Sequence, residues 1–348
     1  MREIEIEISG KIVGNNRPCF VIAEAGVNHN GDFELAKEMI DLAKSAGADA
    51  IKFQTFKTEG VVIRTANMAK YQERSEEKNQ YEMLKSFELE YDDFEELKDY
   101  CDKKNIVFLS TPHSEDAIDF LDRIVPAYKI GSGDLTNLPF LEKVAEKRKP
   151  ILLSTGMATL GEIEDAIRVI RRRGWEKIII LHCVTSYPLR IEDANLRTIQ
   201  TLKYAFRLPV GFSDHTLEII TPAAAVSLGA CIIEKHFTPN RSLHGPDHKA
   251  SLEPREFKMM VDYIRLVEKS LGDGVKVITG EEEEIKKIAR KSIVSKTDIP
   301  QGTVITRDLL EIKRPGTGIA PKSLLLVVGK RAKSDIKKDE LITWNMIT

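Results

Sequence analysis

The sequence predicts a closed (β/α)8 TIM barrel followed by a small β-rich domain. Short apolar strands alternate with helices, eight of each, between residues 19 and 270, and such alternation is typical of a parallel barrel. Every predicted strand ends in polar side chains, at the end where the active sites of such barrels lie. From residue 291 onwards the chain is rich in turns and short strands, which indicates a second domain.

The barrel is expected to begin after a hairpin at residues 3–13, which turns at Ser9 and Gly10. The predicted strands are residues 19–23, 50–54, 106–110, 127–130, 150–154, 177–182, 209–212 and 231–238. The predicted helices are residues 33–46, 91–103, 114–122, 138–146, 161–172, 196–204, 219–228 and 254–270, and a long polar segment (57–86) interrupts the second unit. A doubly wound sheet is disfavoured because Glu24-Ala-Gly-Val-Asn is no glycine-rich dinucleotide turn.

The carboxyl-terminal part of the chain differs from the barrel in composition and in the pattern of its predicted elements. We expect the barrel to occupy residues 1–272, a polar linker with a solvated acidic run to follow at 273–290, and the second domain to occupy 291–348. Segments 298–306 and 335–343 echo each other as turn-plus-strand units. This repeat predicts a small pseudo-symmetric domain of about 60 residues.

Composition limits the possible partners. The 52 basic and 54 acidic residues nearly balance, so no global field favours nucleic acid or an anionic membrane. The longest apolar run is too short to span a bilayer, and the first residues read as a strand and do not resemble a signal peptide. The four scattered cysteines contain no CxxC pair, which favours free thiols in a reducing compartment. A cytoplasmic protein is expected.

Two lysines and several hydroxyls at strand ends suggest an anion site. Cations with many O–H and N–H donors suit a phosphorylated acid, whereas each lysine taken alone could equally be a surface residue or half of an ion pair. The members of this group are Lys52, Lys129, Thr111, Ser132, Ser154 and Ser213.

Residues Glu234, Lys235 and His236 follow one another where the last strand ends, and we interpret all three as marking a site. His215 and His236 end neighbouring strands, so they could share one metal ion, or be hydrogen-bonded structural histidines. Carboxylates available for acid–base chemistry, or for salt bridges, are Glu24, Glu234, Asp134 and Asp247, while His29, His113 and His182 are candidate lining residues.

At this point the motifs resemble those of the sialic acid synthase family. They occur in order at consecutive strand ends: Glu24-Ala-Gly-Val-Asn-His-Asn-Gly, Ile51-Lys-Phe-Gln, Ser110-Thr-Pro, Lys129-Ile-Gly-Ser-Gly-Asp, Leu153-Ser-Thr-Gly-Met, Gly211-Phe-Ser-Asp-His, Glu234-Lys-His-Phe and Gly245-Pro-Asp-His. The tail, with Lys313-Arg-Pro-Gly-Thr-Gly-Ile, resembles the family's antifreeze-like (SAF) domain.

The resemblance implies a condensation of phosphoenolpyruvate with an N-acetylated hexosamine, typically N-acetylmannosamine, that yields a nine-carbon 2-keto acid and phosphate. It implies that His215 and His236 bind a divalent metal (manganese, magnesium or cobalt). It implies phosphoenolpyruvate contacts by Lys52, Thr111, Lys129, Ser132, Ser154 and Ser213, and sugar or catalytic contacts by Glu24, Tyr187, Asp247 and Arg314; Gln54 joins the candidate substrate-binding residues. Asp134 stands where relatives often have Glu, which leaves its role and the preferred sugar open.

The resemblance also implies a homodimer in which each SAF domain reaches the partner's barrel and supplies Arg314 to its site. Three alternatives remain at this stage. One is a metal-dependent synthase of a shorter keto-sugar phosphate, and another is a Schiff-base aldolase. The third is a non-catalytic carbohydrate- or ice-binding protein. The sequence does not decide between N-acetylmannosamine and the bacillosamine-derived sugars that lead to legionaminic or pseudaminic acid, because one or two side chains distinguish such substrates.

Overall fold

The computed structural model describes residues 4–68 and 79–348 of the chain. The chain divides into two compact units, Met1–Gly272 and Asp273–Thr348, and each is described by itself. Within these described ranges, no helix combines the length and the apolar character that a bilayer crossing requires.

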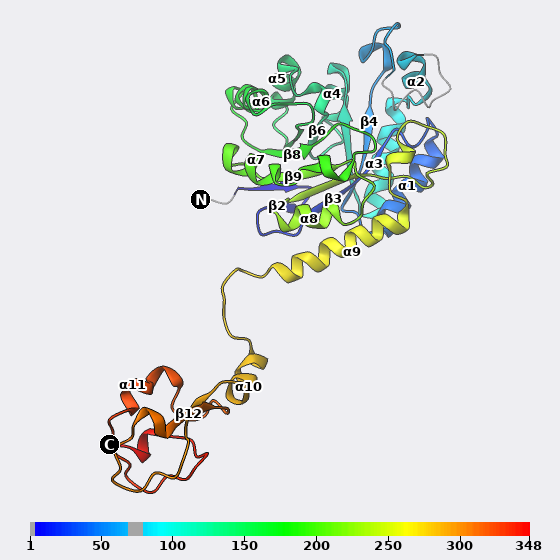
Figure 1. Cartoon of the computed structure of the whole chain (residues 1–348). Coiled ribbons are helices and arrows are strands. Elements are labelled where there is room, and N and C mark those ends of the chain that lie inside the picture. Colours follow the sequence, from blue (N-terminus) through cyan, green and yellow to red (C-terminus); the bar gives the residue numbers. More distant parts are fainter. Residues whose placement is uncertain (1–3, 69–78) are drawn as a thin grey trace. The chain divides into compact units, whose positions relative to one another are not determined.

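The first unit is a nearly closed barrel of eight parallel strands, which confirms the predicted fold (Figure 1). The strands follow the order β5-β4-β3-β10-β9-β8-β7-β6, and β5 and β6 at the two ends of this order also contact each other. Their bounds are β3 (Phe20–Gly26), β4 (Ala50–Thr55), β5 (Val107–Pro112), β6 (Tyr128–Ile130), β7 (Ile151–Ser154), β8 (Ile178–Cys183), β9 (Val210–Asp214) and β10 (Ile232–His236).

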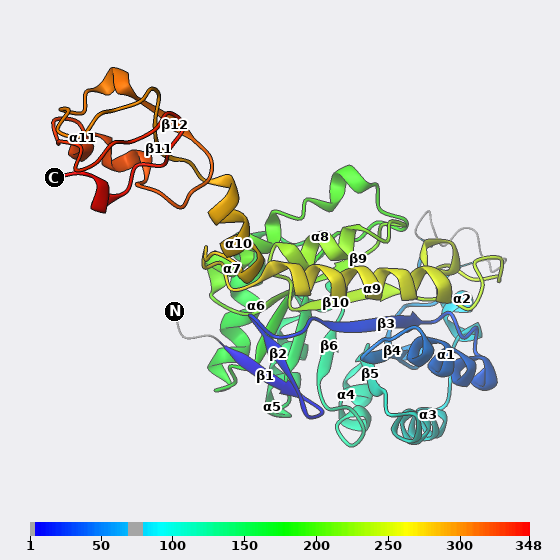
Figure 2. The same ribbon diagram turned by 90° about the horizontal axis from the view of Figure 1, so that it is seen from below.

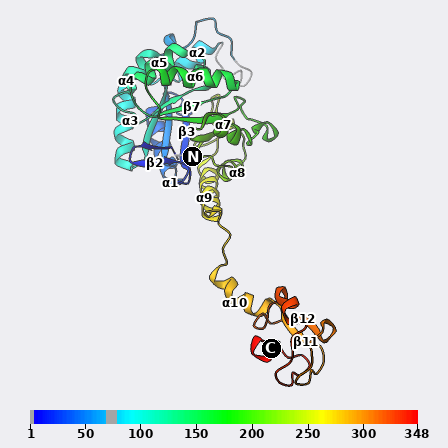
Figure 3. The same ribbon diagram turned by 90° about the vertical axis from the view of Figure 1, so that its left-hand side faces the viewer.

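A ring of helices covers the outside of the strands, as Figure 3 shows for α3 to α6. The helices are α1 (Phe33–Ser45), α3 (Tyr91–Lys104), α4 (Glu115–Leu121), α5 (Leu138–Glu146), α6 (Leu160–Arg172), α7 (Thr198–Phe206), α8 (Thr221–Ser227) and α9 (Pro254–Leu271). Helix α6 illustrates why they form: a capping box between Thr159 and Glu162 satisfies its first N–H groups, and Ile163, Ile167 and Ile170 bury one face. One further helix, α2 (Gln80–Ser86), lies inside the polar segment between β4 and α3.

The amino-terminal end of the barrel is closed by apolar side chains. The hairpin formed by β1 (Glu5–Ile8) and β2 (Lys11–Gly14) is labelled in Figure 2. It contributes Ile6, Ile8 and Val13 to a cluster with the inward-facing residues of the barrel strands. A larger cluster fills the layer between strands and helices. Polar side chains therefore reach the inside of the barrel at its carboxyl-terminal end.

The second unit is small and pseudo-symmetric. It contains α10 (Gly280–Ala289), β11 (Ser292–Ser295), β12 (Leu310–Lys313) and α11 (Leu324–Val327) around a core of isoleucines and other apolar residues. The two echoing segments lie against each other: Ile299 and Ile336 exchange backbone hydrogen bonds of 2.8 and 2.9 Å. Asp298 accepts from the N–H of Lys338, and Asp335 accepts from that of Gln301, both at 2.8 Å.

Helix α10 occupies part of segment 273–290, which the sequence analysis treats as a linker. A capping box between Thr279 and Glu282 starts this helix, whose side chains are mostly exposed. Near its end, the carbonyl of Lys287 accepts a 2.8 Å hydrogen bond from the N–H of Gly316. The end of α10 is therefore tied to the loop after β12 in the second unit.

Candidate active site at the carboxyl ends of the barrel strands

A cavity of about 220 Å³ opens at the carboxyl ends of the strands. Every barrel strand, or the loop that follows it, contributes to its wall. Most of the candidate residues line it: Glu24, Lys52, Gln54, Thr111, Lys129, Ser132, Ser154, Tyr187, Ser213, His215, Glu234, His236 and Asp247. The carboxyl ends of the strands thus bring together residues that lie more than 200 positions apart in the chain.

Strand alternation decides which polar residues face the cavity. Glu234 and His236 of β10 line it, while Lys235 between them is fully buried on the opposite face of the strand. There the Lys235 ammonium lies 2.6 Å from the carboxylate of Asp214, its registered neighbour on β9. The interpretation of all three ionisable residues as site markers was therefore wrong for Lys235, because a buried cation can be satisfied by a partner strand.

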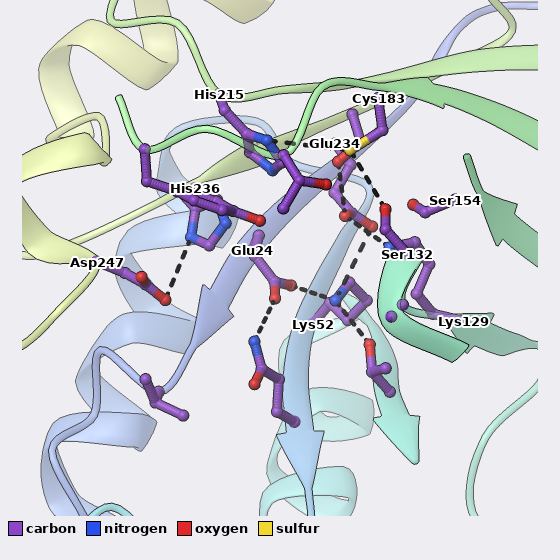
Figure 4. A pocket seen from close by; sticks show the side chains of 18 of the residues that line it. Glu24, Lys52, Lys129, Ser132, Ser154, Cys183, His215, Glu234, His236 and Asp247 are labelled. Carbon is purple, nitrogen blue, oxygen red and sulfur yellow. Dashed lines mark hydrogen bonds and ion pairs between the residues drawn. The ribbon is translucent and has the colours of Figure 1, made fainter. Parts of the chain in front are cut away.

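Two buried lysines and two buried carboxylates form the centre of the cavity (Figure 4). The Nζ of Lys52 lies 2.6 Å from Oε2 of Glu24 and 4.0 Å from Oε2 of Glu234, and it donates to Oγ1 of Thr111 at 2.9 Å. The Nζ of Lys129 lies 3.0 Å from Oε1 of Glu234. The cations are thus held in place by neighbours that leave the middle of the cavity open to a ligand.

The two carboxyl groups differ in their readiness to hold a proton. Burial raises the pKa of Glu24 to about 7; the positive charge of Lys52 opposes this rise and the negative charge of Glu234 adds to it. Burial also disfavours ionisation of Glu234, but Lys129 and Lys52 outweigh it and lower the pKa of Glu234 to about 2. Glu234 is therefore a permanent anion at neutral pH, whereas Glu24 can accept or release a proton.

Hydroxyl and amide groups gather beside Lys129, at the ends of β6, β7 and β8. The Oγ of Ser132 accepts a 3.0 Å hydrogen bond from the N–H of Gly156. In the described part of the chain, the buried Oγ of Ser154 and Oγ1 of Thr185 have no hydrogen-bond partner. A Cβ on Gly156 would lie 2.1 Å from Oγ1 of Thr185, so this corner requires glycine. Two unsatisfied buried hydroxyls beside a cation provide donors for an anionic ligand.

The two candidate metal ligands face each other. The rings of His215 and His236 lie 5.4 Å apart between centroids. Nδ1 of His215 lies 2.7 Å from the carbonyl of Val184, and in the neutral tautomer that donates Nδ1–H to this carbonyl, Nε2 carries a lone pair. Burial lowers the pKa of His215, but Cys183 and the Val184 carbonyl outweigh it and raise this pKa above its usual value. Burial, together with the charges of His215 and Lys52, holds the pKa of His236 well below its usual range, so its imidazole is neutral.

These imidazoles fit a divalent ion with open positions. The buried Nδ1 of His236 has no hydrogen-bond partner among the described residues and lies 4.0 Å from Oδ2 of Asp247. No group of three or more His, Cys, Asp or Glu residues in 4–68 and 79–348 is arranged to hold a metal by itself. An ion bound by the two imidazoles would therefore need further ligands from water or substrate.

Polar groups also converge beside β3. Gly26 has a φ of +53°, and a Cβ built there would lie 3.3 Å from Oε1 of Glu24, 3.4 Å from Nε2 of Gln54 and 3.8 Å from Oδ2 of Asp247. Burial raises the pKa of Asp247 to about 6, although His215 opposes the rise. The Tyr187 ring contacts that of His215 in a tilted arrangement, with 4.2 Å between centroids. These groups can hold a polyhydroxylated ligand next to the imidazoles.

Two candidate residues do not line the cavity. Asp134 ends a short 3-10 helix, and its Oδ2 lies 3.8 Å from Nδ1 of His113, which does line the cavity. Arg314 lies in the second unit, exposed, directly after β12. A direct role for Asp134 in the cavity therefore has no support from its position.

The remaining candidate histidines divide. His113 lines the cavity, whereas His182 and His29 do not. Nε2 of His182 lies 2.8 Å from the carbonyl of Ala194, and its ring stacks on Phe212 at 5.5 Å. These contacts make His182 a structural histidine.

The sequence analysis missed several lining residues. Cys183 follows the alternation of β8, so its position could have been read from the spacing of that strand, whereas Thr185 lies in the loop after the strand. Four further missed residues are apolar, and they come from the loop after β3, from α2 and from the residue after α2: Val27, Met83, Leu84 and Phe87. No pattern in the sequence distinguished these residues from ordinary core side chains.

Comparison with known proteins identifies the relatives of the chain. Residues 39–276 match the NeuB family, and residues 290–348 match the SAF domain. The N,N'-diacetyllegionaminic acid synthase of Legionella pneumophila is 44% identical, with 96% of each chain covered. An uncharacterized protein of Methanocaldococcus jannaschii is 46% identical, with 98% of each chain covered.

A solved structure shows a similar fold. It is the N-acetylneuraminic acid (sialic acid) synthetase of Leptospira borgpetersenii in complex with citrate. It matches with a TM-score of 0.73 and 39% sequence identity, over 81% of this chain and 95% of the other. This protein is therefore similar to the chain in both fold and sequence.

Proposed function

The chain belongs to the NeuB family of sialic-acid-type synthases, and from this premise we propose that it condenses phosphoenolpyruvate with an N-acetylated hexosamine. The products are a nine-carbon 2-keto sugar acid and phosphate. One observation carries the proposal: a single cavity holds two groups of residues that suit the two substrates. Two buried lysines and unsatisfied hydroxyls line one side, and two imidazoles that can bind a metal ion line the other side, next to polar groups that can bind a sugar.

Phosphoenolpyruvate occupies the lysine side in this proposal. Its phosphate and carboxylate carry up to three negative charges, which Lys52 and Lys129 can neutralise together with the hydroxyls of Ser132, Ser154 and Ser213. Thr111 orients Lys52 through its 2.9 Å hydrogen bond, and Glu234 orients Lys129 at 3.0 Å. The same two lysines stabilise the charge of the departing phosphate.

His215 and His236 would hold a divalent ion such as manganese, magnesium or cobalt. When bound, the ion would supply Lewis-acid polarisation of the sugar's aldehyde oxygen. Gln54, Asp247 and Tyr187 surround the same space and would orient the open-chain sugar by hydrogen bonds to its hydroxyls. The aldehyde carbon would thus be held facing the methylene carbon of phosphoenolpyruvate.

The reaction balances with one water molecule. The methylene carbon of phosphoenolpyruvate forms the new C–C bond to the aldehyde carbon, and positive charge develops at the enol carbon. Glu24 takes a proton from water as the water oxygen adds to that carbon, for which a pKa of about 7 suits it. The tetrahedral intermediate then expels phosphate, its hydroxyl proton goes to the departing phosphate, and the 2-keto acid remains. The proton held by Glu24 goes to the former aldehyde oxygen, which becomes a hydroxyl of the product.

A Schiff-base mechanism lacks a suitable lysine in this cavity. Burial disfavours the charged form of Lys129, but Glu234 and Glu24 outweigh it and raise the pKa of the ammonium. Lys52 is ion-paired at 2.6 Å with Glu24. An amine nucleophile needs a lowered pKa, and phosphoenolpyruvate is already an activated enol that does not require one.

The proposal includes a homodimer in which the SAF domain completes the partner's site. Arg314 is exposed at the end of β12, in a loop rich in turn-forming residues. A guanidinium in such a loop can fork onto a carbonyl or hydroxyl of the sugar. Exchange of the domain between two copies closes under two-fold symmetry and needs no other protein.

A cytoplasmic location also belongs to the proposal, because all four cysteines are free and buried. The experiment that tests the function measures phosphate release from phosphoenolpyruvate by the purified protein. Release that depends strictly on an N-acetylated hexosamine, with formation of a nine-carbon keto acid, supports it. Release that needs a sugar phosphate of another class, or trapping of a lysine adduct by borohydride, contradicts it.

A further inference from the structure

Asp247 reaches the cavity on the irregular loop between β10 and α9, residues 237–253, and the loop after β3 holds this segment in place. Nδ2 of Asn30 donates to the carbonyl of His244 at 2.8 Å, and Oδ1 of Asn30 lies 3.1 Å from Nε2 of His248. Gly245 has a φ of +146°, and a Cβ there would lie 2.8 Å from Cδ2 of His248 and 3.0 Å from Oδ1 of Asn30. The two loops therefore pack closely against each other beside Asp247.

A second link between the two loops runs through the side chain of Asn28. This side chain is fully buried, and its Nδ2 donates to the carbonyl of Phe237 and to Oγ of Ser251, both at 2.9 Å. Ser251 is also fully buried, and its hydroxyl donates in turn to the carbonyl of Asp247 at 2.7 Å. Phe237 directly follows His236. One buried amide is thus connected to the backbone beside both His236 and Asp247.

These hydrogen bonds lie behind a precise contact in the cavity. Oδ2 of Asp247 lies 4.0 Å from Nδ1 of His236, as the dashed line in Figure 4 marks. Among the residues that the structure describes, Asp247 and His236 belong to the cavity wall, whereas Asn28 and Ser251 do not. Asn28 and Ser251 can therefore influence a ligand only through the residues that they hold.

We propose that Asn28 and Ser251 are positioning residues whose hydrogen bonds fix the Asp247 carboxylate beside the His236 imidazole, where it binds a hydroxyl of the acceptor sugar. This inference rests on the proposed condensation and on the place of Asp247 among the sugar-binding groups. It adds the residues that set the geometry of that part of the site.

The physical reason is that a carboxylate recognises a hydroxyl only at hydrogen-bond distance. A displacement of about 1 Å, caused by a change away from the reacting atoms, can lower the rate by about a hundredfold. Without the Ser251 hydroxyl, the Asp247 carbonyl keeps a 3.0 Å hydrogen bond from the N–H of Ala250, so the displacement should be partial. We therefore expect a loss of about tenfold when this hydroxyl is removed.

The test measures initial-rate phosphate release by the full-length protein with the N-acetylated hexosamine that the wild type uses best. Ser251→Ala should lower kcat/KM for the sugar about tenfold and leave KM for phosphoenolpyruvate nearly unchanged. Ser251→Thr keeps the hydroxyl and should restore most of the activity. Asn28→Asp keeps the shape of the side chain but places an oxygen against two acceptors, so its loss should exceed that of Ser251→Ala. Ser251→Cys, with a weak donor, serves if Ser251→Ala cannot be purified.

Tyr128→Phe is the matched control for lost stability. Tyr128 is fully buried on β6, outside the cavity, and its hydroxyl donates to the carbonyl of Ile118 at 2.8 Å. Both Tyr128→Phe and Ser251→Ala remove a buried hydrogen bond from a hydroxyl to a backbone carbonyl, so both should lower the melting temperature. Only Ser251→Ala should change kcat/KM for the sugar.

A double-mutant cycle shows whether Ser251 acts through Asp247. In the Asp247→Asn background, the carboxylate that Ser251 holds is already absent. The additional change Ser251→Ala should therefore lower kcat/KM for the sugar by about threefold or less, compared with about tenfold in the wild-type background.

The outcomes separate this inference from the function it builds on. If no N-acetylated hexosamine supports phosphate release by the wild type, the proposed condensation is wrong, and this inference with it. If the wild type reacts but Ser251→Ala changes kcat/KM for the sugar no more than Tyr128→Phe does, the inference alone is wrong. It is also wrong if Ser251→Ala causes as large a loss in the Asp247→Asn background as in the wild type, because the hydroxyl then acts on another group.

Discussion

The variant Glu24→Gln tests the proposed proton acceptor through the pH dependence of the reaction. Burial raises the pKa of Glu24 to about 7, against the opposing charge of Lys52 and with the added repulsion of Glu234. If ionised Glu24 takes the proton from water, the rate follows its ionised fraction. That fraction is about one tenth at pH 6 and about nine tenths at pH 8, so kcat/KM should rise about tenfold between them.

Glutamine keeps the shape of the side chain but cannot accept the proton. We expect Glu24→Gln to lower kcat by about 10²- to 10⁴-fold and to remove the rise with pH. The substitution should also change how the stability of the folded protein depends on pH. Because the folded pKa lies above the ordinary 4.5, Glu24 contributes stability at low pH that is lost as pH rises through about 7. The melting temperature of Glu24→Gln relative to wild type should therefore increase from pH 4.5 to pH 7.

The assay is initial-rate phosphate release from pH 5.5 to 8.5 at two metal concentrations. If protonation of metal-binding imidazoles caused the rise of the rate with pH, the pH of the rise would change with metal concentration. A rise caused by Glu24 would stay at the same pH. Glu234→Gln is the matched control. It removes a negative charge that raises the pKa of Glu24, so the rise of the rate with pH should occur at lower pH in this variant than in wild type. A rise that stays near pH 7 in Glu24→Gln refutes the assignment.

Three further predictions concern the metal, the anion site and the tail. Chelation should abolish turnover and added manganese restore it, and His215→Ala and His236→Ala should each lower activity about a hundredfold or more; full activity in excess chelator contradicts this. Lys129→Ala should raise KM for phosphoenolpyruvate roughly tenfold to a hundredfold and leave KM for the sugar nearly unchanged, since a charge-assisted contact contributes about 1.5–3 kcal/mol; the reverse pattern means that the two sub-sites are exchanged. Arg314→Ala and His236→Ala should each be nearly inactive, yet regain part of the activity once mixed and allowed to exchange subunits. If mass spectrometry shows exchange and the mixture stays inactive, the tail does not complete the partner's site.

The barrel could be predicted because its signal is repeated along the chain. Each apolar strand is followed by a helix, and the parallel strands then have to carry their carboxyl ends to one side. The candidate lining residues followed from the same rule, since alternate positions on a strand share a face: Lys52 with Gln54, and Ser213 with His215. The regular alternation of side chains along the strands therefore allowed most lining residues of the cavity to be predicted from the sequence.

The missed residues lie where that regularity ends. Thr185 is in a loop, and nothing in its sequence shows that its hydroxyl is buried without a partner. Helix α2 lies in a segment whose many charged residues indicate surface, yet Met83 and Leu84 turn inward from it. Asp134 follows β6 closely but ends outside the cavity beside His113. Loop direction depends on tertiary packing, which no local pattern encodes.

The pair Asp214–Lys235 shows how a misread residue still serves the site. Each of the two lies next to a metal-ligand candidate, His215 or His236, but on the opposite face of its strand. Besides Asp214, the Lys235 ammonium donates to the carbonyls of Thr216 and Glu218, so it joins the end of β10 to the loop after β9. This network fixes the relative height of the two strand ends, and with it the separation of the two imidazoles on the inner face. Removing one charge of a buried pair costs about 3–5 kcal/mol because the other is left unpaired. Lys235, which the sequence analysis interpreted as marking the site, therefore supports the site from the outer face of the strand through its ion pair with Asp214.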